Sequence, residues 1–208
     1  NEIQSVLLAS SLEVYGTITN DSKPLTEEAQ GFLNPMDVRS SYPMAKRAAE
    51  TLCHNYAKEY GTHTKVARLA QTFGAGVTKN DNRVFAQFAR SIINGEDIIM
   101  HTKGELCRCY CYTTDAIAAM LYILLRGKDG EAYNVANETT YISIKDMATF
   151  LAETFNPKVK VVVELKENMG YSPTTKLRLS TNKIQQLGWT PHYNLQEMFH
   201  RLIESLKQ

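Results

Sequence analysis

The residues best suited to chemistry are Tyr42 and Lys46, which stand four positions apart in the segment Ser-Ser-Tyr-Pro-Met-Ala-Lys. Residues at this spacing share one face of an α-helix, so the phenol and the ammonium group can approach each other. A free tyrosine has a pKa of about 10, and a cation about 4 Å away lowers the pKa of a phenol by roughly two to three units. The pair therefore predicts a general base that works near neutral pH, although this spacing also occurs by chance on many helices.

The segment that carries the pair has the features of a helix over residues 42–60. Ser40 or Ser41 is a candidate N-cap, Pro43 suits the first helical position, and Gly61 suits the C-terminal end. An apolar stripe at helical spacing is expected to face the core. Its members are Ala45, Ala48, Ala49, Leu52, Cys53 and Tyr56.

A second segment, residues 6–16, is an apolar run that ends in small hydroxyl residues and a glycine. It predicts a buried parallel strand over about 5–10, whose carboxyl end lies where open α/β sheets bind their ligands. A serine at this end can hydrogen-bond a substrate hydroxyl group. The alternative is that Ser10 and Ser11 simply cap the end of the strand.

Four stretches in order resemble the extended short-chain dehydrogenase/reductase family, in its NAD-dependent nucleotide-sugar epimerase/dehydratase branch. They are Ser-Ser-Leu-Glu-Val-Tyr-Gly at 10–16, Tyr-Pro-Met-Ala-Lys at 42–46, Ala-Arg-Leu-Ala-Gln-Thr-Phe-Gly-Ala-Gly at 67–76 and Arg-Cys-Tyr-Cys-Tyr-Thr-Thr-Asp at 108–115. A weaker fifth stretch covers 182–191, so the resemblance extends over essentially the whole chain. It implies an α/β fold: the C-terminal part of a Rossmann-like parallel sheet plus a small α/β substrate-binding domain.

The alternation of helix and strand patterns favours the same layered α/β class. Beyond the elements above, we expect strands at 64–70, 98–100, 106–112, 131–136 and 159–165, and helices at 82–94, 113–125, 143–154, 181–187 and 195–206. By the resemblance, residues 1–76, with 107–137 returning to them, form the remaining part of the dinucleotide-binding domain. Residues 77–106 and 138–208 form the nucleotide-sugar-binding domain.

The resemblance also implies roles for catalytic residues. Tyr42 would take the proton from the sugar 4-hydroxyl as a hydride leaves C4 for NAD⁺, and NAD would be regenerated in each turnover. Lys46 would support Tyr42 and hold the nicotinamide ribose, while Ser11 would hydrogen-bond the same sugar hydroxyl. Tyr42, Lys46 and Ser10 are the residues expected to contact NAD.

Further residues are implied for the substrate, a nucleotide sugar. Arg108 sits where the family places an arginine on the diphosphate, and a guanidinium group binds phosphate oxygens in pairs; the alternative is a surface arginine paired with a carboxylate. Gln71 stands where many members have an asparagine that contacts the substrate phosphate. Arg83 and Val84 match the segment that lines the pocket, and Arg178 is a weaker basic candidate for which a solvated loop is the alternative.

The type of reaction depends on two neighbouring positions. Leu12 stands where sugar 4,6-dehydratases carry an aspartate that protonates the leaving hydroxyl, which argues against dehydration. Glu13 is the remaining catalytic candidate, in a Ser-x-Glu arrangement close to that of decarboxylases acting on UDP-glucuronate, but also found in epimerases. A structural cap is an equal alternative for this carboxylate. We expect epimerisation ahead of decarboxylation, both ahead of dehydration, with a non-catalytic binding module as the competing class.

The chain contains no Gly-x-x-Gly-x-x-Gly turn of the kind that holds a dinucleotide pyrophosphate at a helix N-terminus. The nearest cluster, Gly74-Ala75-Gly76, is too short and follows the wrong strand. We therefore expect a C-terminal portion of a longer NAD-dependent parent, with little NAD affinity and no turnover by these residues alone. An open strand edge at 5–10 and the helix at 42–60 predict a homodimer or higher oligomer.

Composition and charge exclude several classes of partner. The chain has 208 residues, 43% of them hydrophobic, and a formal net charge of +1, which gives no reason to expect nucleic acid or an anionic membrane as a partner. No apolar run approaches the roughly 20 residues of a membrane span, and a cytoplasmic protein is expected. Cys107, Cys109 and Cys111 alternate on one strand face, so we expect a row of core thiols, with Cys53 also in the core, rather than a metal site.

Overall fold

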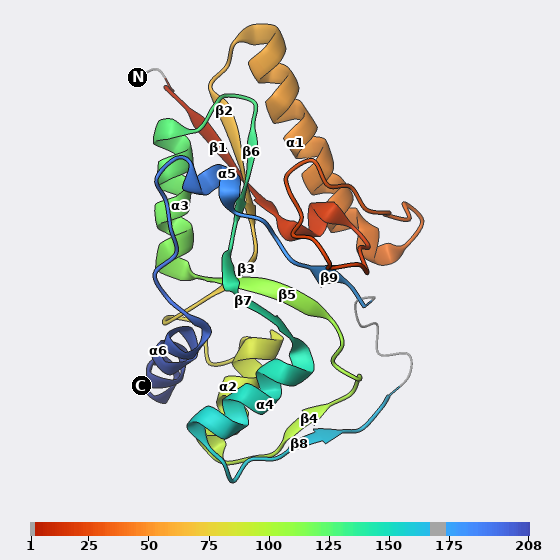
Figure 1. Cartoon of the computed structure of the whole chain (residues 1–208), viewed down its shortest axis with the longest axis vertical. Coiled ribbons are helices and arrows are strands. Elements are labelled where there is room, and N and C mark those ends of the chain that lie inside the picture. The colour runs from red at the N-terminus through yellow and green to blue at the C-terminus, as the bar shows by residue number, and fades with distance from the viewer. Residues whose placement is uncertain (1–2, 167–173) are drawn as a thin grey trace.

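The computed structural model describes residues 3–166 and 174–208. Strands β1 (Val6–Ser11), β2 (Thr64–Leu69) and β6 (Ala132–Val135) form a parallel sheet in that order. Helix α1 (Ser41–Tyr60) covers one face of the sheet, and helix α3 (Thr113–Arg126) covers the other (Figure 1). This layered arrangement confirms the expected α/β class.

Strand β5 (Cys107–Tyr112) joins this sheet to the other half of the molecule. It pairs in parallel with β3 (Gln71–Phe73) and β9 (Lys176–Leu177), and antiparallel with β7 (Asn137–Ser143). Figure 1 shows β5 and β7 crossing between the two halves of the molecule. The ends of these strands therefore bring residues from distant parts of the sequence to one place.

The second half is a helical layer beside a small sheet. Its helices are α2 (Val84–Asn94), α4 (Ile144–Phe155) and α6 (Leu195–Lys207), and its sheet pairs β4 (Ile98–Met100) with β8 (Val161–Val163) in parallel. None of the helices within the described ranges is long and apolar enough to cross a membrane.

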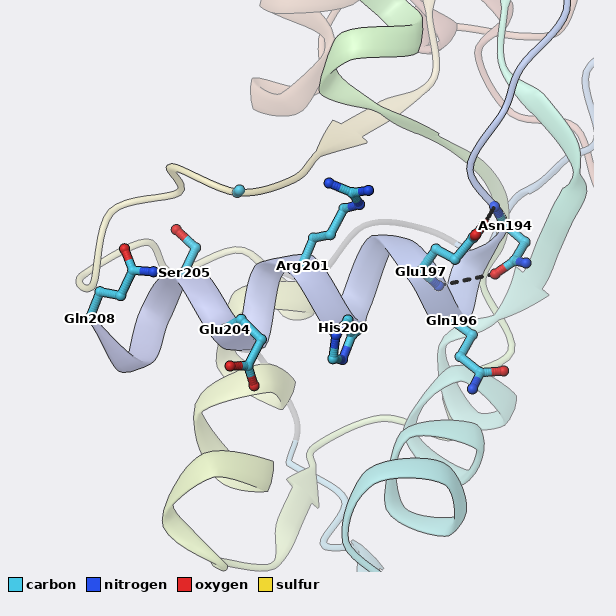
Figure 2. Close-up of a pocket in the computed structure, with 9 residues that line it drawn as sticks. Asn194, Gln196, Glu197, His200, Arg201, Glu204, Ser205 and Gln208 are labelled. Carbon is cyan, nitrogen blue, oxygen red and sulfur yellow. Dashed lines mark hydrogen bonds between the residues drawn. The ribbon is translucent and has the colours of Figure 1, made fainter.

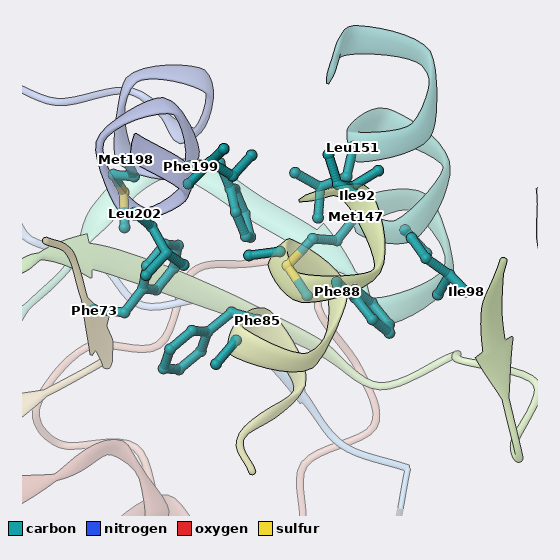
Figure 3. Packing of buried hydrophobic residues seen from close by; sticks show 14 of the residues in the cluster. Phe73, Phe85, Phe88, Ile92, Ile98, Met147, Leu151, Met198, Phe199 and Leu202 are labelled. Carbon is teal, nitrogen blue, oxygen red and sulfur yellow. The ribbon is translucent and has the colours of Figure 1, made fainter. Parts of the chain in front are cut away.

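Aromatic side chains fill the core of this second half (Figure 3). The ring of Phe73, which ends β3, stacks on Phe85 of α2 with centroids 4.4 Å apart, and lies 4.9 Å from the ring of Phe199 on α6. Phe73 of β3 therefore packs against two helices, α2 and α6. Burial of such large apolar rings is the main stabilising contribution in this layer.

The expected strands and helices are present, with bounds that differ by a few residues, and α5 (Asn182–Gln185) is shorter than predicted. The sequence did not predict the strands β3, β7 and β9 or the two 3₁₀ turns, η1 (Leu12–Tyr15) and η2 (Val38–Ser40). Both turns flank the candidate site.

The start of α1 differs from the expectation. The helix begins at Ser41, so Pro43 is its third residue rather than its first, and Ser40 makes no capping hydrogen bond through its side chain. The cap lies earlier, where Asp37 accepts a hydrogen bond from the backbone of Arg39 and starts η2. Gly61 ends the helix as predicted, with a left-handed φ of 65° that favours glycine.

The predicted apolar stripe on α1 was wrong for most of its members. Leu52 is 58% exposed and Tyr56 is 52% exposed, whereas the polar side chains of Lys46 and Glu50 are partly buried on the face toward the sheet. The reason is that hydrogen bonds and an ion pair, rather than apolar packing, dominate this interface.

The cysteines follow the expected pattern in part. Cys109 and Cys111 are buried as predicted, while Cys107 and Cys53 are only half buried. Burial raises the pKa of the Cys109 thiol to about 12 and also raises that of Cys107, so these groups stay protonated at neutral pH.

Candidate functional site

The candidate site lies at the carboxyl end of β1, where the chain turns into η1. The hydroxyl oxygen of Ser11 accepts a hydrogen bond of 3.2 Å from the backbone N–H of Glu13 and so caps the turn. This is the capping role that the sequence left open for Ser11, and it holds Glu13 two residues beyond the strand end. The amino-terminal end of α1 lies against the same turn, as η1 and α1 are in contact.

Tyr42 and Lys46 lie together at this end of α1. The ammonium nitrogen of Lys46 is 5.7 Å from the centroid of the Tyr42 ring, and it donates a hydrogen bond of 2.8 Å to the carbonyl oxygen of Ala9 near the end of β1. Tyr42 is 49% exposed, and within the described residues its hydroxyl makes no hydrogen bond. The phenol is therefore accessible to a ligand at the sheet edge, and the cation beside it is held in place.

A cavity of about 210 Å³ opens beside this pair. Its lining includes Ser40 and Pro43, which flank the start of α1, together with Glu13 and Arg108. Since ligand pockets usually measure roughly 300–1,000 Å³, this cavity has room for part of a nucleotide-sized ligand. The fold thus brings Glu13, on the turn after β1, close to Arg108, on β5.

Two buried polar atoms in this cavity have no partner among the described residues. One nitrogen of the Arg108 guanidinium and the hydroxyl of Thr175 are inaccessible to solvent and unbonded, and the two residues are only 7% and 6% exposed. Burial lowers the pKa of Arg108, and the charge of Glu13 acts in the opposite direction. A buried cation without a hydrogen-bond acceptor costs free energy, and an anionic ligand in the cavity would satisfy it.

Ser10, a predicted NAD contact, points elsewhere in this structure. It is 4% exposed, and its hydroxyl donates a hydrogen bond of 2.5 Å to the carboxylate of Glu50 on α1. Its hydroxyl therefore belongs to the interface between β1 and α1 rather than to the cavity.

Four predicted substrate residues do not line the cavity. Gln71 begins β3, and Val84 is the exposed first residue of α2. Arg83 is exposed and forms an ion pair of 2.6 Å with Asp81. Arg178 is exposed, as the alternative of a solvated position anticipated.

A larger hollow, of about 790 Å³, runs along α6 near the turn at residues 74–76. Figure 2 shows that Arg201 and Ser205 lie on the side of α6 toward that turn, whereas His200 and Glu204 point to the other side. The polar groups do not converge, and both unpartnered buried side-chain atoms found in the described residues lie in the smaller cavity instead. We therefore place the candidate site in the smaller cavity.

Three of the lining residues were not predicted from the sequence. Thr175 lies in an ordinary polar run, and Asn34 and Asp37 lie in the long loop before α1. Their place in the site depends on β9 pairing with β5 and on the loop folding back over η1, neither of which has a local sequence pattern.

A dinucleotide would fit this site only at one end. The exposed Tyr42 hydroxyl and the tethered Lys46 suit the ribose next to a nicotinamide ring. The turn at Gly74 and Gly76 follows β3 and leads into a loop, so it does not supply the strand-to-helix cradle that a pyrophosphate needs.

A family model described as "NAD dependent epimerase/dehydratase family" matches residues 1–136. Among curated relatives, UDP-glucuronic acid decarboxylase 5 of Arabidopsis thaliana is 30% identical over 192 residues, covering 92% of this chain and 54% of the relative. UDP-glucuronic acid decarboxylase 1 of Xenopus tropicalis is 30% identical over 203 residues, covering 98% of this chain and 47% of the relative. The chain thus spans about half the length of these relatives.

Solved structures share the fold. The UDP-glucose 4-epimerase of Thermotoga maritima, solved with UDP-glucose, superimposes with a TM-score of 0.82 at 22% identity, covering 99% of this chain and 64% of that chain. The dTDP-glucose 4,6-dehydratase of Bacillus anthracis, solved with NAD, gives a TM-score of 0.79 at 17% identity, covering 98% of this chain and 61% of that chain. At these identities the likeness concerns the Rossmann-like fold alone.

Proposed function

Because the chain belongs to the NAD-dependent epimerase/dehydratase family, we propose that it carries the catalytic and substrate-binding residues for transient oxidation of a nucleotide sugar at C4. The supporting observation is the unpartnered, buried guanidinium of Arg108 in the cavity that opens beside the start of α1. A diphosphate is the anion that this cation suits, because guanidinium binds phosphate oxygens in pairs. The hydroxyl of Thr175 is a second donor for the same oxygens.

The roles of the other residues follow from where they lie. The Tyr42 oxygen accepts the proton of the sugar 4-hydroxyl, and Ser11 hydrogen-bonds that hydroxyl from the end of β1. Lys46, tethered to Ala9, stabilises the negative charge on the phenol oxygen. NAD, when bound, would supply the hydride acceptor for C4 and the hydride donor for the later reduction of the ketone.

The curated relatives favour decarboxylation as the outcome, ahead of the epimerisation that the sequence alone favoured, and one buried residue argues against dehydration. A 4-keto sugar with a carboxylate on C5 is a β-keto acid, which loses carbon dioxide without an acid to protonate a leaving hydroxyl. Leu12 is 2% exposed and belongs to the core, so it leaves no room for such an acid in its place. Glu13 lines the cavity, and we assign it the delivery of a proton to C5 after carbon dioxide leaves.

Binding of UDP to the 208-residue chain tests the substrate site. We expect calorimetry to detect binding that Arg108→Met weakens by about 10- to 100-fold, with Arg126→Met, a change at an exposed arginine at the end of α3, as the matched control. Equal UDP affinity of the Arg108→Met variant and the unaltered chain would contradict the proposed site.

Turnover requires the pyrophosphate-binding loop, so we expect none from the 208 residues alone with NAD and UDP-glucuronate. To measure activity, the missing loop is supplied from the Arabidopsis decarboxylase: its segment that precedes the matched region is joined to the N-terminus of these 208 residues. We call this protein the fused enzyme. Mass spectrometry of its product separates the reactions. Loss of carbon dioxide indicates decarboxylation, and loss of water indicates dehydration. With UDP-glucose as substrate, an unchanged mass together with altered NMR signals indicates epimerisation. A fused enzyme that binds NAD and UDP but forms no product would favour the binding-module class.

A further inference from the structure

Helix α1 carries a third polar side chain on the same face as the catalytic pair. Tyr42, Lys46 and Glu50 follow one another at intervals of four residues, so their side chains lie in a row along the helix. Lys46 reaches the carbonyl oxygen of Ala9, and Glu50 reaches the hydroxyl of Ser10, the next residue on β1. The helix is therefore joined to β1 at two adjacent positions, through two consecutive turns of α1.

Glu50 is held in turn by an arginine of the central strand. The guanidinium of Arg68 donates from Nε to both carboxylate oxygens, at 3.1 and 3.0 Å, and from Nη2 to Oε2 at 2.7 Å. The side chains of Arg68 and Glu50 are only 15% and 11% exposed. Arg68 is the register partner of Ser10 across the β1–β2 pair, so the three groups meet at one level of the sheet.

Arg68 also reaches the turn that carries the other catalytic residues. Its Nη1 donates to the hydroxyl of Tyr15, at 3.1 Å, and to the carbonyl oxygen of Glu27, at 2.6 Å. Tyr15 ends η1, and its hydroxyl donates at 2.7 Å to Asn134 on β6. Burial raises the pKa of Tyr15 to about 12, so this phenol stays protonated and keeps that donor.

We propose that Glu50 and Arg68 are positioning residues that set α1, with Tyr42 and Lys46, at a fixed place relative to η1; their catalytic meaning rests on the proposed function. A buried ion pair contributes little net stability, because the cost of removing two charges from water offsets their attraction. The ion pair instead fixes the orientation of α1 relative to β2, because a bidentate guanidinium–carboxylate contact is satisfied in one geometry only. A shift of about 1 Å at a catalytic group can reduce a rate by about 100-fold.

The test uses the 208-residue chain and does not depend on turnover. The ¹³C carbonyl shift of Ala9 reports the hydrogen bond from Lys46, and Lys46→Met defines its value when that bond is lost. We expect Glu50→Gln, which keeps the size of the side chain but removes its charge, to move this shift more than half of the way to the Lys46→Met value. An Ala9 signal that stays at its wild-type position in Glu50→Gln would overturn the proposal.

The matched control is Glu131→Gln, which also breaks an ion pair, of 2.9 Å to Lys183, but at the start of β6. It should leave the Ala9 signal unmoved; a movement equal to that of Glu50→Gln would mean that the shift reports general loosening and would overturn the inference. If Glu50→Gln does not fold, Arg68→Lys replaces it, because lysine keeps the charge and loses the bidentate contact. This variant should move the Ala9 signal part of the way, and an unmoved signal would again contradict the proposal.

The two proposals fail in different ways. If Glu50→Gln moves the Ala9 signal while the unaltered fused enzyme forms no product, the positioning role stands and the proposed function fails. If the fused enzyme is active and the Ala9 signal does not move, the function stands and the positioning role fails. When both hold, Glu50→Gln in the fused enzyme lowers kcat about 10- to 100-fold and leaves the KM for substrate unchanged.

Discussion

The ammonium nitrogen of Lys46 lies 5.7 Å from the centroid of the Tyr42 ring, within the range of a favourable cation–π contact. The hydrogen bond to Ala9 fixes the lysine, whereas the phenol hydroxyl is unbonded within the described residues. A cation that is tethered to the sheet, beside a phenol that is available to a ligand, is the arrangement that the proposed proton transfer needs.

Loss of the tethered cation should impair chemistry more than binding. In the fused enzyme we expect Lys46→Met to lower kcat by about 100- to 10,000-fold, the usual contribution of a positioned acid–base group, while UDP affinity is unchanged. Steady-state kinetics and calorimetry measure the two effects. Lys58→Met, an exposed lysine of the same helix, is the control. A Lys46→Met enzyme with wild-type kcat would contradict the assignment.

Arg108 should lower the stability of the free chain and raise its affinity for UDP. In the free chain its guanidinium is buried with an unpartnered nitrogen, so we expect Arg108→Met to raise the free energy of unfolding by about 1–3 kcal/mol. The same change should weaken UDP binding by about 10- to 100-fold, because charge-assisted hydrogen bonds are lost. Urea denaturation and calorimetry measure the two quantities, and a variant that loses stability together with affinity would argue for a structural role instead.

An aspartate at position 12 should not restore the acid of a dehydratase. Leu12 is buried in a cluster with Val14 and Leu177, so a carboxylate there is both desolvated and badly packed. We expect Leu12→Asp to lower the free energy of unfolding by about 3 kcal/mol or more, whereas Leu12→Met costs less than about 1.5 kcal/mol. A stable Leu12→Asp fused enzyme that eliminates water would show that the side chain faces the substrate.

Glu27 should make stability depend on pH. Burial raises its pKa above the ordinary 4.5, although it accepts a hydrogen bond from the backbone of Asn134. The folded chain therefore binds this proton more tightly than the unfolded chain, and stability falls as the pH rises from about 4.5 through the folded-state pKa.

Glu27→Gln keeps the acceptor oxygen and should be more stable than the wild type at neutral pH, with the difference vanishing near pH 4. Thermal melts across this range measure the effect. Glu28→Gln is the control, because the hydrogen bond from Thr26 lowers the pKa of Glu28 and reverses the sign. If Glu27→Gln and the wild type melt alike at neutral pH, burial of this carboxyl has no energetic consequence.

The sequence predicted the fold wherever a periodic pattern was long enough. The strand β1, the helix α1 with Gly61 after its last residue, and the helix α6 beginning at Leu195 all have clear apolar or capping patterns and lie within a few residues of the expected bounds. The strands β3 and β9 are three and two residues long, too short to show alternation. They exist because β5 offers them a partner, which is a tertiary effect.

The orientation of α1 could not be predicted for a related reason. Ala48, Leu52 and Tyr56 form an apolar stripe, and such stripes usually face the core. Here the opposite face is buried, because Glu50 finds Arg68 and Lys46 finds a backbone oxygen on the sheet. Pairs that form only in the folded chain leave no periodic pattern.

The part of the candidate site that lies in sequence motifs could be predicted. The spacing of Tyr42 and Lys46 correctly placed the two side chains together, and the family pattern led to Arg108. The catalytic and binding roles themselves remain predictions, as do the division into two domains and the oligomer. The unpartnered hydroxyl of Thr175 was not foreseen, because it depends on a strand pairing remote in sequence.

The central claim is that the Tyr42 oxygen removes the proton of the sugar 4-hydroxyl. Its most direct test is the turnover number of the Tyr42→Phe fused enzyme, which lacks a single oxygen atom, at saturating NAD and UDP-glucuronate. We predict that kcat falls at least about 100-fold while UDP binds as tightly as in the wild type. A Tyr42→Phe enzyme that turns over at the wild-type rate would contradict the account.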